Sequence, residues 1–272
     1  MLRKKASVLI AVLVFLTAWI FWSWVPVTEK ITVNAHAKNP VDVKIALITD
    51  LHSCFYGKNQ SWLTKRIDRE NPDIAIFAGD IFDDKISDKN AQILLEHLVK
   101  KYPCYYVTGN HEVWSGRVNE MKDWLRNAGV NVLEGGCMSI SLGGLDLDIC
   151  GVDDPVSMTL DEWKKQIDRA HSLTDDSHFK ILVSHRPERV SVYEQYDFDL
   201  ILTGHAHAGQ IRIPFLNRGL YAPNQGVMAK YVSGIYTLSN GSLMEVSRGL
   251  ARESTPLPRF FNHPELVILE LK

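Results

Sequence analysis

The chain has 272 residues, enough for one large α/β domain and a short additional segment. Hydrophobic residues make up 46% of it and charged residues 23%, so a sizeable core is expected and a disordered chain is excluded. The formal net charge of −2 argues against a protein that binds nucleic acid by neutralising phosphates. We therefore expect a globular domain with no specific nucleic-acid binding.

The N-terminus differs from the rest of the chain. Three basic residues among the first five precede an uncharged apolar stretch, residues 6–25, which ends at Pro26. About 20 apolar residues suffice to cross a bilayer as a helix, and tryptophans gather where such a helix meets the headgroups. Residues 1–27 are thus predicted to form a single-pass signal-anchor transmembrane helix in the cell membrane. Its positive flank would stay in the cytoplasm and the remaining chain would lie outside.

A cleaved signal peptide is the main alternative to an anchor. Its apolar region is usually shorter, and a site with two small residues should follow closely. Ala35-His36-Ala37 has the right residues but lies well beyond the apolar stretch. A buried helix would normally carry a polar stripe, which residues 6–25 lack. Residues 28–41 are interpreted as a tether and residues 42–272 as the globular domain.

Short apolar runs alternate with helical patterns through the first half of this domain. The alternation is typical of a parallel or mixed sheet covered by helices, an α/β fold. The runs after residue 209 are short and irregular, which indicates a second sheet. Strands are predicted at 44–49, 73–78, 105–108, 179–184, 200–203 and 266–271, and helices at 62–70, 91–101 and 118–128.

A hairpin is predicted between residues 138 and 149, where apolar and polar residues alternate on both sides of Gly143-Gly144. If Leu142 faces Leu145, Cys137 lies opposite Cys150 in a non-hydrogen-bonded pair, close enough for a disulfide. An exported domain would permit that bond. The alternative of two unpaired thiols stays open, because the count depends on the register.

Five segments place acids, amides or imidazoles just after a predicted strand. In α/β sheets, ligand sites form at the carboxyl ends of strands, where the loops converge. Neutral imidazoles and carboxylates bind first-row transition metals, and an asparagine carbonyl adds a hard oxygen. Seven such residues exceed the needs of one four-coordinate ion, whereas two ions that share a carboxylate would use them. The segments are Asp50-Leu51-His52, Gly79 to Asp83, Gly109-Asn110-His111-Glu112, His185, and Gly204-His205-Ala206-His207.

Taken in order, the motifs DxH, GDxxD, GNHE, an isolated histidine and GHxH resemble the calcineurin-like metallophosphoesterase superfamily. The motifs span residues 50–207, and the resemblance covers the chain from about residue 42 to the C-terminus. The extended motif GHAHAGQIRIP and the apolar N-terminus are most similar to the exported, membrane-anchored bacterial branch, which is related to UDP-2,3-diacylglucosamine pyrophosphatases. The fold that the resemblance implies is a four-layer α/β/β/α sandwich of two mixed sheets.

The resemblance also implies two divalent metal ions (manganese, iron or zinc) and a set of ligands. One ion would be held by Asp50, His52, Asp80 and His207. The second would be held by Asp80, Asn110, His185 and His205, with Asp80 bridging. His111 would be the catalytic proton donor to the leaving oxygen, and Asp83 would orient its ring.

Such a centre would hydrolyse a phosphoester or a pyrophosphate by attack of a metal-bridging hydroxide. The anchor favours a phosphorylated small molecule or a lipid-linked substrate at the membrane, and the resemblance implies one like UDP-2,3-diacylglucosamine as a candidate. A phosphoprotein phosphatase and a non-catalytic metal-binding scaffold are the alternatives. Asp153-Asp154-Pro155 is interpreted as a turn, with an approach to the site as the alternative, and Arg186 lies near a motif loop, where it could contact substrate.

Overall fold

The computed structural model describes most of the chain. It covers residues 10, 14, 17–19, 22–35, 41–212, 216, 218–254 and 257–272. Much of the apolar stretch predicted to span the membrane lies outside these residues. Among the residues that are described, no helix has the length and apolarity to cross a bilayer.

The first sheet has six strands and is mixed. Its inner strand β3 is apolar and buried at every position, because both faces of the sheet are covered. Only β14 and β2 pair antiparallel, while the other neighbours are parallel. The strand order is β1 (Val27–Val33), β14 (Glu265–Leu271), β2 (Val43–Ile48), β3 (Ile74–Ala78), β4 (Cys104–Val107) and β5 (Asn131–Val132).

The second sheet also has six strands and is mixed. Its centre, formed by β7, β8 and β9, is parallel, and an antiparallel strand lies at each edge. A separate two-stranded hairpin is formed by β10 (Gly219–Ala222) and β11 (Gly226–Ala229). The order in the large sheet is β12 (Gly234–Thr237), β13 (Leu243–Val246), β9 (Leu200–Thr203), β8 (Phe179–Val183), β7 (Leu145–Gly151) and β6 (Gly136–Leu142).

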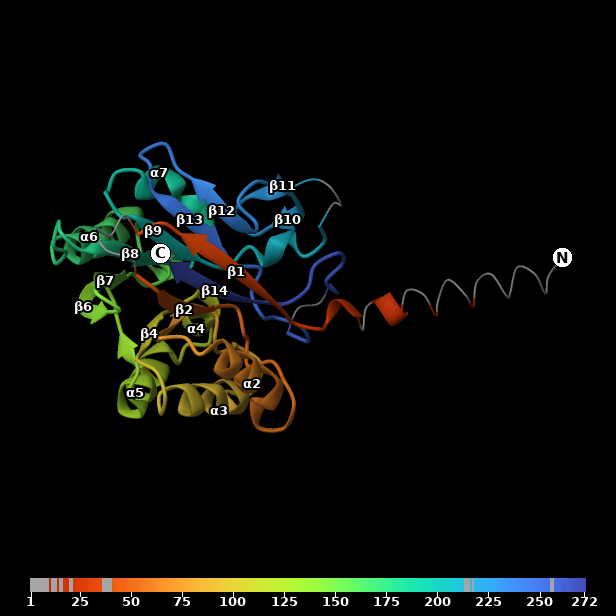
Figure 1. Cartoon of the computed structure of the whole chain (residues 1–272). Helices are drawn as coiled ribbons and strands as arrows, with labels where there is room; N and C mark the ends of the chain where they lie inside the picture. The colour runs from red at the N-terminus through yellow and green to blue at the C-terminus, as the bar shows by residue number, and fades with distance from the viewer. Residues whose placement is uncertain are drawn as a thin grey trace.

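The two sheets pack face to face, and helices cover their outer faces (Figure 1). One apolar core lies between the sheets, where Ile45 and Ile76 of the first meet Ile149 and Ile181 of the second. A second core joins the first sheet to its helices, and a third joins the second sheet to its own. The expected α/β fold with two mixed sheets is confirmed. The first group of helices is α2 (Ser61–Glu70), α3 (Lys89–Leu98) and α5 (Val118–Ala128), and the second is α6 (Leu160–His171) and α7 (Val190–Tyr193).

The segment interpreted as a tether differs from that expectation. Residues Val27–Val33 form strand β1, which pairs parallel with β14 at the edge of the first sheet. Glu29 and Lys30 point to solvent while Val33 is buried, so the polar residues that suggested a linker belong to an exposed edge strand.

The predicted hairpin is present as β6 and β7, with both glycines of its turn at positive φ. Leu142 pairs with Leu145, which brings Cys137 opposite Cys150, and their sulfur atoms form a disulfide. The other two cysteines, Cys54 and Cys104, are buried free thiols.

Candidate metal centre

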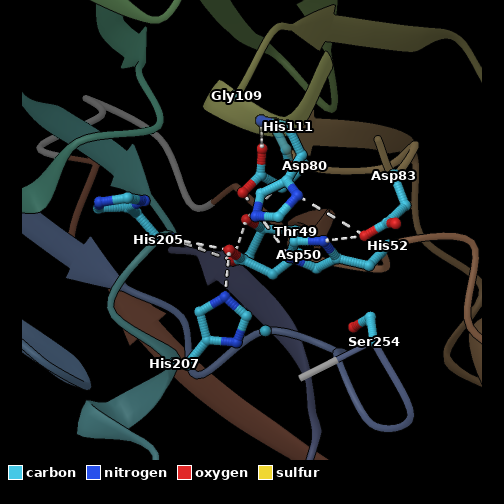
Figure 2. A network of polar contacts seen from close by, with 12 residues as sticks. Thr49, Asp50, His52, Asp80, Asp83, Gly109, His111, His205, His207 and Ser254 are labelled. Carbon is cyan, nitrogen blue, oxygen red and sulfur yellow. Dashed lines mark hydrogen bonds and ion pairs between the residues drawn. The ribbon is translucent and has the colours of Figure 1, made fainter. Parts of the chain in front are cut away.

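Every residue predicted for the site lies in a loop that directly follows a strand. The strands come from both sheets, so their carboxyl ends meet at one edge of the sandwich. Figure 2 shows the imidazole rings of four histidines arranged around the carboxylates of two aspartates. Asp50 and His52 follow β2, Asp80 and Asp83 follow β3, Asn110 and His111 begin the short helix α4 (Asn110–Trp114) after β4, His185 follows β8, and His205 and His207 follow β9.

Asp50 is the centre of the first group of donors. Its Oδ1 lies 3.3 Å from His207 Nε2, and one ligand atom each of Asp50, His52 and His207 fall within 4.8 Å of one another. The other side of the carboxylate is fixed by Thr49 Oγ1, which donates to Oδ2 at 2.6 Å, and by the backbone N–H of His205. The carboxylate is thus oriented before any ion binds.

Asp80 is the centre of the second group. Its Oδ2 lies 3.1 Å from His185 Nε2 and 3.7 Å from His52 Nε2, so it faces donors of both groups. Ligand atoms of Asp80, His185 and His205 also fall within 4.8 Å of one another. The His185 ring is held by its other nitrogen, which donates to the carbonyl of Ala78 at 2.8 Å.

These residues fit a divalent metal. His52 Nε2, Asn110 Oδ1 and His207 Nδ1 are buried without a hydrogen-bond partner among the described residues. Such buried polar atoms are costly unless a ligand satisfies them. Carboxylate, imidazole and amide donors together suit first-row transition ions.

The charges of the site are set by burial together with the neighbouring charged groups. Burial opposes ionisation of Asp80, but His185 and His52 outweigh it and hold the pKa of this carboxyl well below its usual range. Burial, together with His185 and Arg186, holds the pKa of His205 well below its usual range, so this ring is neutral. An anionic carboxylate and a neutral imidazole are the protonation states that bind metals.

The backbone at the site is strained. Asp50, His52, Asp80, His205 and His207 have φ between 45° and 64°, a region that residues other than glycine seldom occupy. Clusters of such residues mark sites where the surrounding structure enforces a geometry. The glycine of the GNHE motif allows the Asp80 side chain to approach the backbone closely, since a Cβ on Gly109 would lie 2.2 Å from Asp80 Oδ1.

His111 lies beside the two groups of donors. Its ring packs against His52, with 4.4 Å between the ring centroids, and against the exposed ring of Trp114 at 4.9 Å. Its Nδ1 is 2.6 Å from Asp84 Oδ1 but 3.6 Å from Asp83 Oδ2. Asp84, which the sequence reasoning missed, is therefore the nearer partner of this ring. Asp83 instead makes a 3.0 Å hydrogen bond with His52 Nδ1.

Glu112, the last residue of the GNHE motif, joins two of the loops. Its buried carboxylate accepts hydrogen bonds from the backbone N–H groups of Asp80, Ile81, Phe82 and Gly109 at 2.7–3.0 Å. Burial and the nearby Asp80 raise its pKa to about 7. The sequence reasoning assigned Glu112 no role, although its position in the motif was the available signal.

Arg186 joins the loops that carry Asp154 and Asn224 to the site. Its Nη2 donates to Asp154 Oδ1 at 2.8 Å, and its Nη1 contacts His205 Nε2 at 2.8 Å and Asn224 Oδ1 at 2.7 Å. Asp154 also accepts from the backbone of Val156, as expected for the turn that the sequence indicated. Asp154 therefore has two structural roles, since it stabilises this turn and also binds Arg186. Only the turn could be predicted from the neighbouring residues in the sequence.

Comparison with known families gives a match over most of the globular domain. Residues 43–209 match the calcineurin-like phosphoesterase family. The matched range contains all nine residues predicted for the site.

Bacterial and animal relatives share this region. An uncharacterised metallophosphoesterase of Campylobacter jejuni is 34% identical over 85% of this chain and 59% of its own length. YkuE, an uncharacterised metallophosphoesterase of Bacillus subtilis, is 28% identical over 84% of this chain and 79% of its own. A transmembrane protein with a metallophosphoesterase domain from Bos taurus is 27% identical over 94% and 60%. The chain spans about 60% of the length of the first relatives.

A solved structure shares the fold. The NAD nucleotidase of Haemophilus influenzae superposes with a TM-score of 0.51 over 78% of this chain and 46% of its own, at 16% identity. The family match, the relatives and the two groups of metal donors agree with one another. This chain therefore belongs to the calcineurin-like phosphoesterase family.

Proposed function

We propose that the chain is a dinuclear phosphohydrolase that cleaves a phosphoester or a pyrophosphate bond. The observation that carries the proposal is the position of Asp80, whose carboxylate faces His52 of one group of donors and His185 of the other. A carboxylate placed between two groups of donors can serve two ions at once, and paired ions are typical of phosphate hydrolysis.

Each ion has its own ligands in this proposal. Asp50, His52 and His207 would hold one and Asn110, His185 and His205 the other, with Asp80 shared. Manganese, iron and zinc all suit the donors. When bound, the pair supplies a water of lowered pKa and a positive charge for the phosphoryl oxygens.

The chain itself supplies the proton for the leaving group. His111 lies beside His52 without belonging to the ligand set proposed here, and it is partly exposed at the edge of the site. A protonated imidazole in this position donates from Nε2, while Asp84 holds Nδ1 and stabilises the cation. Trp114 packs on the same ring and limits its rotation.

The location proposed is the cell membrane, with the catalytic domain outside the cytoplasm. The apolar residues 6–25 support it by their length, their basic flank and their tryptophans. The Bos taurus relative is named as a transmembrane protein. An anchored enzyme of the exported bacterial branch would act on a lipid-linked or nucleotide-linked phosphate, with a compound similar to UDP-2,3-diacylglucosamine as one candidate.

Hydrolysis of bis(p-nitrophenyl) phosphate and p-nitrophenyl phosphate by the full-length protein tests the proposal. We expect turnover that needs added manganese and two ions per chain by metal analysis. Asp80→Asn should lose bound metal and at least about 100-fold in kcat/KM, because both ions depend on this carboxylate. One ion per chain in an active protein would contradict the dinuclear centre.

A further inference from the structure

Exposed apolar side chains gather at one end of the domain. They come from the segment before β1, from helix α2 and the loop before it, from the β10–β11 hairpin, and from the loop before β14. Figure 1 shows the hairpin and α2 at the end of the domain where the chain enters β1. We call these side chains the apolar rim: Trp22, Val25, Phe55, Trp62, Leu220, Tyr221, Val227, Met228 and Phe261.

Ring contacts and β-bridges connect the segments that carry the rim. Trp19 packs on Phe261 with 4.6 Å between the ring centroids, and Trp22 packs on His263 at 4.2 Å. Ile211 and Phe260 form a β-bridge, and Arg212 bridges to the first residue of β10, so the hairpin is joined to the same loop. Phe55 and Trp62 pack edge to face at 6.2 Å.

The loops that carry the rim also hold the metal centre. Asn262, next to Phe261 of the rim, donates from Nδ2 to the backbone carbonyl of His207 at 2.7 Å. Asn224, at the turn of the hairpin, contacts His205 Nε2 at 3.0 Å. Any surface that binds the rim therefore lies next to the opening of the site.

The surface that fits the rim is a lipid bilayer. The rim includes the end of the apolar stretch, where Trp19 packs on Phe260 and Phe261 and Trp22 packs on His263. A groove of about 420 Å³ between this segment and α2 is lined by apolar side chains and by Arg66 and Arg252, which suits the interface between acyl chains and phosphate headgroups. Contiguous exposed apolar surface of this kind marks an interaction site.

We infer that the apolar rim docks on the membrane and places the opening of the metal centre at headgroup level. The inference rests on the membrane attachment proposed above and adds an orientation to it. An enzyme held in this way takes its phosphate from a lipid headgroup in the same leaflet, without drawing the lipid out of the bilayer. A soluble phosphate ester would reach the site equally well with or without docking.

Single labelled cysteines test the orientation in full-length protein reconstituted into phosphatidylethanolamine–phosphatidylglycerol vesicles. Val227→Cys places a thiol on the hairpin, where the side chain is 71% exposed, and Leu173→Cys places one beyond α6, at 54%. The native cysteines are buried or disulfide-bonded, so a nitrobenzoxadiazole label reacts at the new thiol. Brominated lipids should quench the label at position 227 at least about twofold more than the label at 173.

The outcomes separate the docking from the attachment and from the activity. Equal quenching at both positions, in vesicles that carry the protein and hydrolyse bis(p-nitrophenyl) phosphate, would overturn the docking alone. Protein that fails to float with the vesicles would overturn the attachment and the docking together, whatever its activity. Self-quenching of the label at 227 that grows with protein concentration in detergent would place a second copy on the rim, and would overturn the bilayer as its partner.

Rates on a lipid probe and on a soluble probe test whether docking gives the enzyme access to lipid substrates. The probe is hexadecyl p-nitrophenyl phosphate in the vesicles, compared with soluble bis(p-nitrophenyl) phosphate. Val227→Asp should lower the rate on the lipid probe about fivefold, because it adds a negative charge next to an anionic surface, and should leave the soluble probe unchanged. Leu173→Asp should change neither rate. Equal rates for Val227→Asp and the unaltered protein on the lipid probe would overturn the inference.

Discussion

At the scale of single residues, neighbouring aspartates have different partners. Asp83 is hydrogen-bonded to His52, a proposed metal ligand, whereas Asp84 is hydrogen-bonded to His111, the proposed proton donor. Both are carboxylates after the same strand, and both act on a histidine ring. They differ in the role of that histidine, because His52 is proposed to bind metal and His111 to donate the proton.

Two matched substitutions separate these roles. Asp84→Asn should lower kcat about 10-fold or more and leave the metal content unchanged, because it weakens only the support of the proton donor. Asp83→Asn should lower metal affinity about 10–100-fold, because it releases the ring of a ligand. His111→Ala should lower kcat about 10²–10⁴-fold with its metals retained.

Steady-state kinetics with metal analysis on each protein distinguishes the cases. Metal loss in Asp84→Asn, with full occupancy in Asp83→Asn, would reverse the assignment. Unchanged turnover in a folded His111→Ala protein would remove this histidine from the reaction.

The sequence could place these residues in the site but could not pair them. Each polar group was found because it ends a buried apolar strand, and this pattern is local. The choice between Asp83 and Asp84 as the partner of His111 depends on how the loop turns after Asp80, whose φ is 52°. Strained backbone of this kind is imposed by tertiary packing, so it leaves no local signal in the sequence.

At the scale of elements, Glu112 fixes the loop after β3 against the start of α4. Each of its carboxylate oxygens accepts two backbone N–H groups, and the side chain has no exposed surface. In Glu112→Gln, one of these oxygens becomes an NH₂ group, which cannot accept. We expect a loss of about 2–4 kcal/mol in the free energy of unfolding, since two buried donors lose their partner.

Urea unfolding of the metal-free protein measures this loss without interference from bound ions. Glu120→Gln is the matched control, because this glutamate is exposed in the first turn of α5. A midpoint for Glu112→Gln equal to that of the control would show that the loops are held by other contacts.

The disulfide of the β6–β7 hairpin is a second stabilising feature at the scale of elements. Cys137 and Cys150 are separated by 13 residues, so the bond closes a short loop and restricts the unfolded chain. Replacing both by alanine should lower the free energy of unfolding by about 3 kcal/mol. Reducing agent should shift the urea midpoint of the native protein and leave that of the double variant unchanged. A native midpoint that does not respond to reduction would contradict the prediction.

At the scale of the whole molecule, the sandwich is closed by strands far apart in the sequence. β1 pairs with β14, and β14 in turn pairs with β2, so the two ends of the domain share one sheet. The parallel core after β2 could be predicted, because helical segments separate its successive strands along the chain. The pairing of β1 could not, because VTEKITV is a short amphipathic segment whose partner lies more than 230 residues away.

The position of β1 predicts where the domain can be cut. A protein that starts at residue 36 lacks β1, and one edge of β14 then loses the hydrogen bonds of seven paired residues. A protein that starts at Pro26 keeps them. We expect the shorter protein to unfold at a lower temperature and to aggregate, because an unpaired edge strand at the end of a sheet recruits other chains.

Thermal unfolding and light scattering of the two proteins, in the same detergent-free buffer, check this expectation. Hydrolysis of bis(p-nitrophenyl) phosphate is the internal control, because the metal loops lie outside the deleted segment and should keep their activity while the shorter protein stays folded. Equal melting temperatures and equal scattering would mean that β1 adds nothing to the fold. Residues 28–41 would then act as the tether that the sequence alone predicts.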